Sequence, residues 1–372
     1  MDRPDMLDIT SGEKPGSILI VRYYALGDIV LSFPLVRALR MTFPDSSIDF
    51  LCLNRFREAL DGFAPVDDVI GMDGSTVDRF RTILTLRRKK YDLVIDLLSS
   101  PGSSLITKMS GAVNKIGMDT GRNNWCFDHI LPRGVMRNGK HVKCYTFDSN
   151  LETGRLLGVV DEDPLEAYRG LRSGRYETGF AAAGGHREWA RKFLSDFGPE
   201  KNGYAGLVVG AKYRAKSWPI DYFMELARSI EKDLGMRPIV IWGPGEEYSA
   251  SRVADCCDSA VKPPEMGIGR MGALIGELSV LAGIDSGPKH IAVMEGVPTI
   301  TLFGPTDPHT WDPMTQKHRV LSVDVDCQSH GHGNDEGDGC LSRIKPPEVL
   351  GEIRKVLGIE DKDVCDDGTK YE

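Results

Sequence analysis

Cysteine is scarce in this chain. There are eight cysteines among 372 residues, and the neighbours Cys256 and Cys257 are not spaced as the CxxC pair of a redox or zinc site. So few cysteines do not form the dense disulfide scaffold on which small secreted domains depend. The sequence therefore predicts a protein of a reducing compartment, the cytoplasm.

Long apolar runs and an excess of positive charge are also missing. The runs Ile18–Val21 and Leu97–Leu98 are far shorter than the roughly 20 residues needed to span a bilayer. The amino-terminal residues Met1–Gly16 lack the apolar core of a secretory signal. A formal net charge of −8 argues against a nucleic-acid partner, which normally needs a basic surface. We expect a cytoplasmic protein with at most peripheral contact at the inner face of the cytoplasmic membrane.

What the chain has is a repeated alternation of short apolar runs with longer amphipathic stretches. This pattern is typical of an α/β fold, in which crossover helices cover parallel sheets. Strands are predicted at Ile18–Val21, Ile48–Leu53, Asp68–Ile70, Leu93–Leu97, Gly206–Val209, Pro238–Trp242, Val280–Ile284 and Thr299–Phe303. Helices are predicted at Ile29–Thr42, Thr76–Lys90, Ser103–Ser110, Ile220–Leu234, Met271–Glu277 and Pro288–Glu295.

The two series of elements predict two Rossmann-like domains, because a chain with 41% hydrophobic residues and this length can bury two cores. We place the domains at residues 1–170 and 171–372, with a linker region at Asp161–Gly185 that lacks periodicity and a disordered acidic tail after about residue 360. Ligands of open α/β sheets bind beyond the carboxyl ends of the strands. The loops after the strands are therefore where functional residues are expected.

The first such loop ends in Gly27 and Asp28, just before an apolar helix. Asp28 has two interpretations. It caps the helix by accepting the first free amides, or it acts as a general base that removes the proton of an attacking hydroxyl. Gly27 would keep the approach open to substrate. Asp96, after the fourth strand, is the alternative base in this domain.

The second loop, Gly210–Pro219, follows an apolar strand and reads GAKYRAKSWP. A cation held beside a departing diphosphate stabilises the charge that develops in the transition state. Lys216 is the leading candidate for that role, ahead of Lys212 and Arg214. The alternative is that all three are solvated loop charges.

Two further loops suit a nucleotide. Gly243–Glu247 reads GPGEE, in which Glu246 would accept hydrogen bonds from a ribose or merely favour the helix dipole. Gly283–His290 joins a strand to a helix with proline in its first turn, a design that offers free amides to an anion such as a diphosphate. Taken singly, Asp285 and His290 also suit a helix start and a structural histidine.

Three other features suggest a metal site or a binding surface. Asp324-Val325-Asp326 resembles a metal-binding DxD motif but lies after the last clear strand. A zinc site at Cys327, His330, His332 and Cys340 has irregular spacing. The cations Arg79, Arg81, Arg87, Arg88, Lys89 and Lys90 concentrate on one predicted helix. We interpret that helix as a solvated face, with contact to anionic lipid or a phosphorylated acceptor as the alternative.

Six segments between residues 17 and 357, taken together and in order, resemble the heptosyltransferases of lipopolysaccharide core synthesis, glycosyltransferase family 9. They are ILIVRYYALGDIVLSFPLVRALR, YDLVIDLLSS, GAKYRAKSWP, GPGEE, IDSGPKHIAVMEGVPTITLFGPTDP and KPPEVLGEI. The resemblance implies a GT-B fold and an inverting transfer without metal or cofactor. It also implies ADP-heptose as the usual donor and a lipid-linked saccharide of the lipopolysaccharide inner core as acceptor.

Carried onto this chain, the resemblance makes Asp28 the catalytic base and Lys216 the stabiliser of the leaving group. The predicted donor-binding residues are Ala211, Lys212, Glu246, Asp285, Ser286, Gly287 and His290. The predicted acceptor-binding residues are Tyr24, Gly27 and Arg122.

The chain departs from the family in having Tyr23, Tyr24 and Ala25 where small hydroxyl residues are usual. A nucleotide-sugar 2-epimerase, a family member with another donor, and a binding module without turnover are the competing hypotheses.

Overall fold

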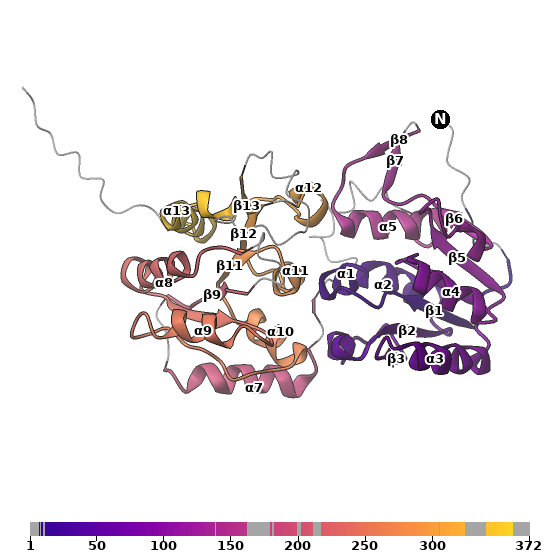
Figure 1. Ribbon diagram of the computed structural model, residues 1–372, viewed down its shortest axis with the longest axis horizontal. Coiled ribbons are helices and arrows are strands. Elements are labelled where there is room, and N and C mark those ends of the chain that lie inside the picture. Colours follow the sequence, from indigo (N-terminus) through magenta and orange to yellow (C-terminus); the bar gives the residue numbers. More distant parts are fainter. Residues whose placement is uncertain are drawn as a thin grey trace, which may run out of the picture.

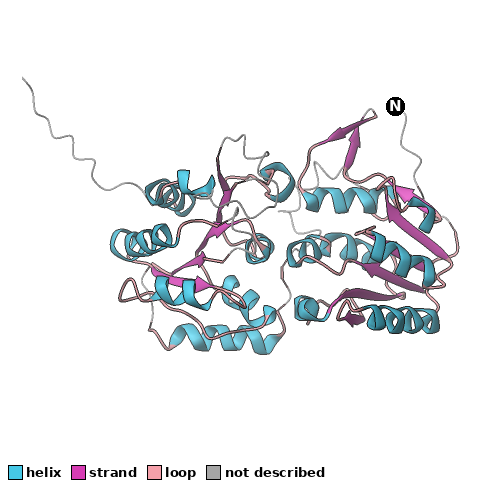
Figure 2. Cartoon of the chain, viewed as in Figure 1, coloured by secondary structure: helices cyan, strands magenta, loops and turns pink. Residues whose placement is uncertain are grey.

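The computed structural model describes residues 7, 9, 12–137, 139–161, 179–180, 182–198, 202–210, 217–304, 306–323 and 340–359. Within these ranges the chain forms two α/β units that lie side by side (Figure 1). Each unit is built on one sheet of parallel strands with helices on both of its faces (Figure 2). The predicted α/β class is thereby confirmed.

The first unit contains a six-stranded sheet in the order β3-β2-β1-β4-β5-β6. Successive residues of its central strand β1 alternate between two buried clusters, with Ile18 and Ile20 in one and Leu19 and Val21 in the other. Because helices cover both faces, β1 is a continuous apolar run. The bounds are β1 Ser17–Val21, β2 Ser47–Leu53, β3 Asp68–Met72, β4 Leu93–Asp96, β5 Asn114–Met118 and β6 His129–Leu131.

Helices of the first unit fall into two layers. Residues of α2 and α5 share a cluster with Ile18, whereas residues of α3 and α4 share one with Leu19. A short antiparallel hairpin, β7–β8, precedes α5. The bounds are α1 Leu26–Leu31, α2 Phe33–Thr42, α3 Thr76–Lys89, α4 Pro101–Met109, β7 Val135–Arg137, β8 Lys140–Val142 and α5 Thr146–Leu156, with the 3₁₀ turns η1 Asn54–Leu60 and η2 Asn124–Cys126.

The second unit contains a five-stranded sheet in the order β10-β9-β11-β12-β13. Its central strands β9 and β11 are direct neighbours, which brings the loops after them to one edge of the sheet. The bounds are β9 Tyr204–Val208, β10 Arg237–Ile241, β11 Val280–Ile284, β12 Thr299–Phe303 and β13 His318–Ser322, with helices α7 Gly184–Ser195, α8 Ile220–Leu234, α9 Glu247–Ala254, α10 Ile268–Gly276, α11 Gly287–Met294, α12 Pro308–Trp311 and α13 Pro346–Leu357 and the 3₁₀ turn η6 Cys340–Arg343.

The predicted helix Ile29–Thr42 is in fact two helices, α1 and α2, which meet at Ser32. Pro34 has no amide hydrogen to continue the α-helical ladder, and the Ser32 hydroxyl instead donates to the Ile29 carbonyl at 2.6 Å. The break shortens α1 to six residues. The amino-terminal end of this short helix lies against α11 of the second unit.

The region predicted as a linker, Asp161–Gly185, is only partly described. Residues 162–178 lie outside the described ranges, and α7 already begins at Gly184. The predicted acidic tail after residue 360 also lies outside them. In the part of the chain that the structure describes, no helix is long and apolar enough to cross a membrane.

Candidate active site

A cavity of about 300 Å³ lies where the two units meet. In the first unit it is lined by Asp28 from α1 and by residues of the β7–β8 hairpin and α5; in the second it is lined by Thr310 and Trp311 of α12. Four of its lining residues carry basic side chains: Arg22, Arg133, His141 and Lys143. The cavity is therefore a cationic space with one carboxylate in its wall.

Asp28 lies in the first turn of α1 but does not occupy the cap position. Ala25 is the N-cap, and the Asp28 carboxylate accepts the Ala25 amide hydrogen at 3.2 Å from the third helical position. The predicted N-cap is thus corrected to the reciprocal half of a capping box. The other carboxylate oxygen forms an ion pair with Arg22. Asp28 is 14% exposed, which leaves it accessible from the cavity.

Two arginines flank Asp28. Arg22 also donates to the Leu97 carbonyl at 2.7 Å, and Arg133 donates to the Leu98 carbonyl at 2.9 Å. Burial lowers the pKa of the Arg133 guanidinium, and the neighbouring Arg22 lowers it further. Both arginines are anchored to the loop after β4. Two fixed cations thus stand beside the carboxylate.

Asp96, the alternative base, is excluded by its surroundings. It is completely buried, and one carboxylate oxygen accepts the amide hydrogens of Leu98 and Ser99 at 3.0 and 2.7 Å. Thr107 donates to its other oxygen at 3.3 Å. Burial raises the pKa of Asp96 to about 6. This residue organises the turn after β4 and does not line the cavity.

On the second unit, the loop between β11 and α11 is built around Asp285. Thr306 donates to one carboxylate oxygen at 3.3 Å, and the other lies 3.7 Å from Nε2 of His290 and 3.6 Å from Nζ of Lys289. Ser286 is the N-cap of α11, but its side chain bonds to the Ile284 carbonyl. The first amides of α11 are therefore not capped by this serine and remain able to bind an anion.

Lys289 is a component of this loop that sequence reasoning missed. It is 2% exposed, hydrogen-bonds the Trp311 carbonyl, and lies 3.6 Å from a carboxylate oxygen of Asp312 as well as from Asp285. Burial raises the pKa of Asp312 against the opposing effect of Lys289. A buried lysine between two carboxylates fixes the Asp285 loop to α12, which lines the cavity.

Two glycines allow α1 and α11 to touch across the boundary (Figure 1). A Cβ atom on Gly27 would lie 2.4 Å from Cδ2 of His290, and one on Gly287 would lie 2.8 Å from Cδ2 of Leu26. The space at Gly27 is thus filled by an imidazole of the second unit. This replaces the prediction that Gly27 keeps the approach open for an acceptor. The contact places Asp28 beside the Asp285–His290 loop.

Glu246, at the N-cap of α9, occupies the carboxyl edge of the second sheet. Its carboxylate accepts the Gly243 amide hydrogen at 2.8 Å, and burial raises its pKa. A Cβ atom on Gly210 would lie 1.6 to 1.9 Å from this carboxyl group. Because β10, β9 and β11 are adjacent, Glu246, Gly210 and Asp285 all follow neighbouring strands at one edge.

A match to a family model identifies the protein family of this chain. Residues 79–338 match the model of glycosyltransferase family 9, described as heptosyltransferase. The chain belongs to glycosyltransferase family 9. It is a glycosyltransferase, and its two parallel-sheet units are those of the GT-B fold.

Relatives of this family 9 enzyme match over nearly their whole length. Lipopolysaccharide heptosyltransferase 3 of Escherichia coli K12 is 26% identical over 357 residues, which cover 91% of this chain and 96% of the relative. Lipopolysaccharide heptosyltransferase 1 of Campylobacter coli is 23% identical, covering 92% and 99%. These relatives support heptosyl transfer as the activity of the family.

Solved structures share the fold. A family 9 glycosyltransferase of Veillonella parvula superposes with a TM-score of 0.75 at 20% identity, covering 95% of this chain and 99% of that one. The E. coli ADP-heptose lipopolysaccharide heptosyltransferase II gives 0.71 at 20%, covering 93% and 100%. A UDP-GlcNAc 2-epimerase of Methanocaldococcus jannaschii gives 0.54 at 13%, covering 93% of each chain. The fold alone therefore does not separate transferase from epimerase.

Several predicted site residues of the family 9 enzyme lie elsewhere or outside the described ranges. Ala211, Lys212 and Lys216 fall in residues 211–216, which are not described. Tyr24 is 42% exposed and packs edge-on against Tyr23 at 5.1 Å, while Arg122 is exposed in the loop after β5. Neither Tyr24 nor Arg122 lines the cavity at Asp28.

The structure bears on one residue of the two metal sites considered from the sequence. Cys340 is disulfide-bonded, so its sulfur is not free to ligate zinc. Its proposed partners Cys327, His330 and His332 lie outside the described residues, as does Asp324-Val325-Asp326. Among the residues that are described, no three His, Cys, Asp or Glu side chains gather as a metal site requires.

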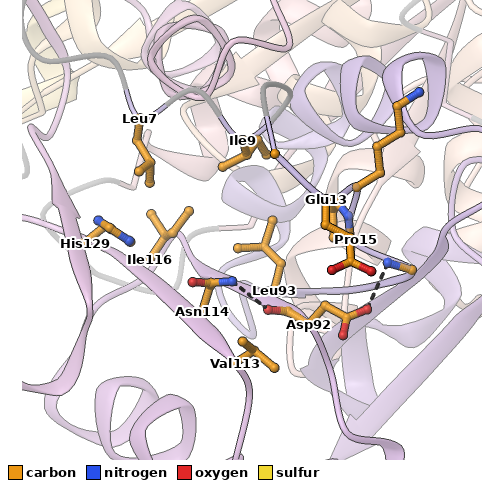
Figure 3. Close-up of a pocket in the computed structure, with 13 residues that line it drawn as sticks. Leu7, Ile9, Glu13, Pro15, Asp92, Leu93, Val113, Asn114, Ile116 and His129 are labelled. Carbon is orange, nitrogen blue, oxygen red and sulfur yellow. Dashed lines mark hydrogen bonds between the residues drawn. The ribbon is translucent and has the colours of Figure 1, made fainter.

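A second cavity, of about 720 Å³, lies at the opposite edge of the first sheet, near the amino ends of β1 and β4 (Figure 3). Its main carboxylate, Asp92, already accepts the amide hydrogens of Gly16 and Ser17 at 2.8 and 2.9 Å. Asn114 donates to the Asp92 backbone carbonyl at 3.4 Å. Asp92 is thus used to anchor the segment that leads into β1, which distinguishes this cavity from the one at Asp28.

Asp148, in the first turn of α5, gives a prediction about pH. It is 5% exposed, its Oδ1 atom accepts no hydrogen bond from any described residue, and burial raises its pKa to about 8. The unfolded value is about 3.9. Between about pH 4 and about pH 8 the native chain therefore holds a proton that the unfolded chain has released. The contribution of Asp148 to stability falls as the pH rises through that window.

We expect Asp148→Asn to remove this loss. From this group alone, the parent should lose up to about 4 kcal/mol of unfolding free energy between pH 5 and pH 8, since each pKa unit corresponds to about 1.4 kcal/mol. The variant should lose much less. Urea unfolding at both pH values measures the difference, with the exposed Asp233→Asn on α8 as control. Equal pH dependence in Asp148→Asn and the parent would contradict the prediction.

Proposed function

We propose that this enzyme moves a heptose from ADP-heptose to a saccharide of the lipopolysaccharide inner core, with inversion at the anomeric carbon. The observation that carries the proposal is the contact at Gly27 and His290, which sets the accessible carboxylate of Asp28 beside the Asp285–His290 loop. A base for an acceptor hydroxyl and a loop suited to a diphosphate thus meet at one boundary. That arrangement fits transfer between two bound substrates.

In this mechanism Asp28 takes the proton of the acceptor hydroxyl while the hydroxyl oxygen attacks the anomeric carbon. The bond from that carbon to the diphosphate breaks, and ADP leaves with the electron pair. The first amides of α11 and the side chain of Lys216 hold the charge that develops on the diphosphate. Lys289 is a positioning residue, because its contacts with Asp285 and the Trp311 carbonyl hold the Asp285 loop in place.

The donor is proposed from the second unit and from relatives. Glu246, Gly210 and Asp285 share one edge of the sheet, where a nucleotide would lie with its ribose near Glu246. One structural neighbour, the E. coli heptosyltransferase WaaC, has been solved with ADP-2-deoxy-2-fluoro heptose. We propose that no metal or other cofactor takes part, because Lys216 and helix amides supply the positive charge.

The acceptor is proposed from the cationic cavity. Arg22, Arg133, His141 and Lys143 surround the space in front of Asp28. Lys143 also forms an ion pair with Asp307 of the second unit at 2.9 Å, so it links the two units at the mouth of the cavity. The positive charges of Arg22, Arg133 and Lys143 favour a saccharide that carries carboxylate or phosphate groups. We therefore propose a lipid-linked acceptor of this kind, and an enzyme that acts in the cytoplasm at the inner face of the membrane.

Donor screening tests the proposal. ADP-heptose should raise the melting temperature more than UDP-, GDP- or CMP-sugars, because a ligand at about 100 times its dissociation constant stabilises the native state by about 2.7 kcal/mol. With ADP-heptose and a lipid A precursor bearing acidic inner-core sugars, ADP and an extended saccharide should form, and EDTA should leave the rate unchanged.

Each other outcome has a defined meaning. A new sugar isomer formed from donor alone would identify a 2-epimerase. Stabilisation by another nucleotide sugar would change the donor and keep the transferase. Donor binding without any product from a range of acidic acceptors would indicate a binding module. Loss of transfer in EDTA that Mg²⁺ restores would overturn the proposal that no metal takes part.

A further inference from the structure

The outward face of α3 carries a stripe of apolar side chains among its arginines, although the helix lies on the surface of the first unit. Thr82, Ile83 and Leu86 are buried against the sheet. On the other side, Val77, Phe80 and Leu84 are 62%, 59% and 55% exposed. Their spacing of three and four residues places them in one stripe along the helix. A helix that only faced water would carry polar side chains there.

Two further large apolar side chains are exposed, on α4, which packs beside α3, and on η2, which packs beside α4. Leu105 on the neighbouring helix α4 is 48% exposed, and Trp125 in η2 is 66% exposed. Lys108 of α4 connects the two, since its Nζ atom donates to the Trp125 carbonyl at 3.5 Å. We call this surface the α3–α4 face. It comprises Val77, Phe80, Leu84, Leu105 and Trp125 with the cations Arg81, Arg87, Arg88 and Lys108.

Two cations of this face, Arg87 and Arg88, remain available to a partner. Within the described residues, Arg87 and Arg88 are exposed and form no ion pair. Lys89 differs, because it pairs with Asp49 and Asp68 at 2.7 Å each. The cations at the end of α3 therefore have two roles. Lys89 binds the end of the helix to β2 and β3, while Arg87 and Arg88 border the apolar stripe.

Apolar side chains bordered by arginines suit the surface of an anionic bilayer. Helices that lie in a membrane interface bury an apolar face among the acyl chains and place cations at anionic headgroups. The local positive charge stands out on a chain of net charge −8. An anionic bilayer matches both the apolar side chains and the adjoining positive charge of this face.

The position of the face relative to the active site fits this partner. In a parallel sheet the crossover helices start at the carboxyl edge of the strands. α3 and α4 therefore begin at the edge where Asp28 lies, and Tyr23 near Asp28 bonds to Ser100 at the start of α4 at 3.2 Å. A bilayer against α3 and α4 would hold that edge near the headgroups.

We propose that the α3–α4 face docks the enzyme on an anionic lipid bilayer. The purpose of docking, access to a lipid-linked acceptor, rests on the proposed function, but the surface itself is tested without any acceptor. The parent chain should sediment with vesicles of phosphatidylcholine and phosphatidylglycerol. It should bind pure phosphatidylcholine vesicles much less, and salt should weaken the binding to anionic vesicles.

Two double variants test the two kinds of contact. Phe80→Ser with Leu84→Ser should lower the partition coefficient by about tenfold or more, because two apolar side chains no longer enter the interface. Arg87→Gln with Arg88→Gln should lower it by a similar factor and reduce the salt dependence. The control Tyr248→Ser removes an aromatic side chain that is 73% exposed on the second unit, and it should bind like the parent.

Donor stabilisation by ADP-heptose, measured on the same preparations, shows that each variant is folded. Undiminished vesicle binding by both double variants would overturn the proposal, as would a parent that binds no anionic vesicle. A parent that is dimeric, with the dimer lost in Phe80→Ser with Leu84→Ser, would show that a second copy covers the face and would also overturn it. Vesicle binding without stabilisation by any nucleotide sugar would support the surface while contradicting the proposed function.

Discussion

Asp28→Asn should lower the rate of transfer by about 10²- to 10⁴-fold, the range typical for loss of a general base. Asparagine keeps an oxygen that accepts the Ala25 amide hydrogen, so α1 retains its capping contact. It cannot take up the proton of an acceptor hydroxyl. The variant should therefore fold and bind nucleotide, yet transfer little. Melting curves, donor binding and a transfer assay on one preparation measure all three.

The ion pair with Arg22 needs a control of its own, because Asp28→Asn breaks it as well. Arg22→Gln removes the same pair and leaves the carboxylate in place. If Asp28 is the base, Arg22→Gln should retain much more activity than Asp28→Asn. Comparable losses in the two variants would make the pair, and not proton removal, the important feature. A folded Asp28→Asn variant with nearly parental turnover would remove Asp28 from the mechanism.

The sequence predicted the positions of the loops that follow buried strands, although the roles of their residues stay predictions. Continuous apolar runs such as β1 and β11 identify parallel strands, and the residues just after them lie at the ligand-binding edge. Asp28 and Asp285 were chosen as candidate site residues in this way. The sequence does not show that α1 and α11, which carry the neighbouring residues, touch across the boundary; that contact depends on Gly27 and Gly287.

Other parts of the cavity left no such signal. Arg133, His141 and Lys143 come from a short hairpin region without an apolar run, so nothing in the local pattern indicated that it folds back over Asp28. The helix α5 beneath it was missed for a different reason. It buries Asp148, Glu152 and other polar residues, which obscures the amphipathic period. A helix that buries polar side chains is recognised only when the groups that surround those side chains are known.

Conversely, some predicted roles depended on surroundings that the sequence does not show. Asp96 follows a strand as Asp28 does, but it is turned inward to bind amides of its own loop. Lys289 stands next to His290 in a segment already singled out, yet its burial between Asp285 and Asp312 becomes visible only in the structure. A residue type at a strand end thus indicates a location, and its contacts decide the role.

Lys216 is the second residue whose replacement should have a large effect. Its segment follows β9, and β9 lies between β10 and β11 in the sheet. Gly210, which precedes this segment, has no side chain, and the Glu246 carboxyl group occupies the space beside it. Trp218, which follows the segment, donates a hydrogen bond from Nε1 to the Ile344 carbonyl at 3.0 Å. Gly210, the last described residue before this segment, therefore lies at the carboxyl edge of the sheet, where the diphosphate is proposed to bind.

Lys216→Ala should reduce kcat by about 10²- to 10³-fold, as removal of one group that stabilises transition-state charge typically does. The affinity for intact ADP-heptose should fall by much less, because the diphosphate gains charge only as the bond to the sugar breaks. Single-turnover rates and donor titration by calorimetry separate the two effects. Lys262→Ala is the matched control, since this lysine pairs with Glu247 on α9 at the same edge and has no proposed role in turnover. Equal losses of kcat and donor affinity in Lys216→Ala would make Lys216 a binding residue and leave the α11 amides as the groups that receive the departing charge.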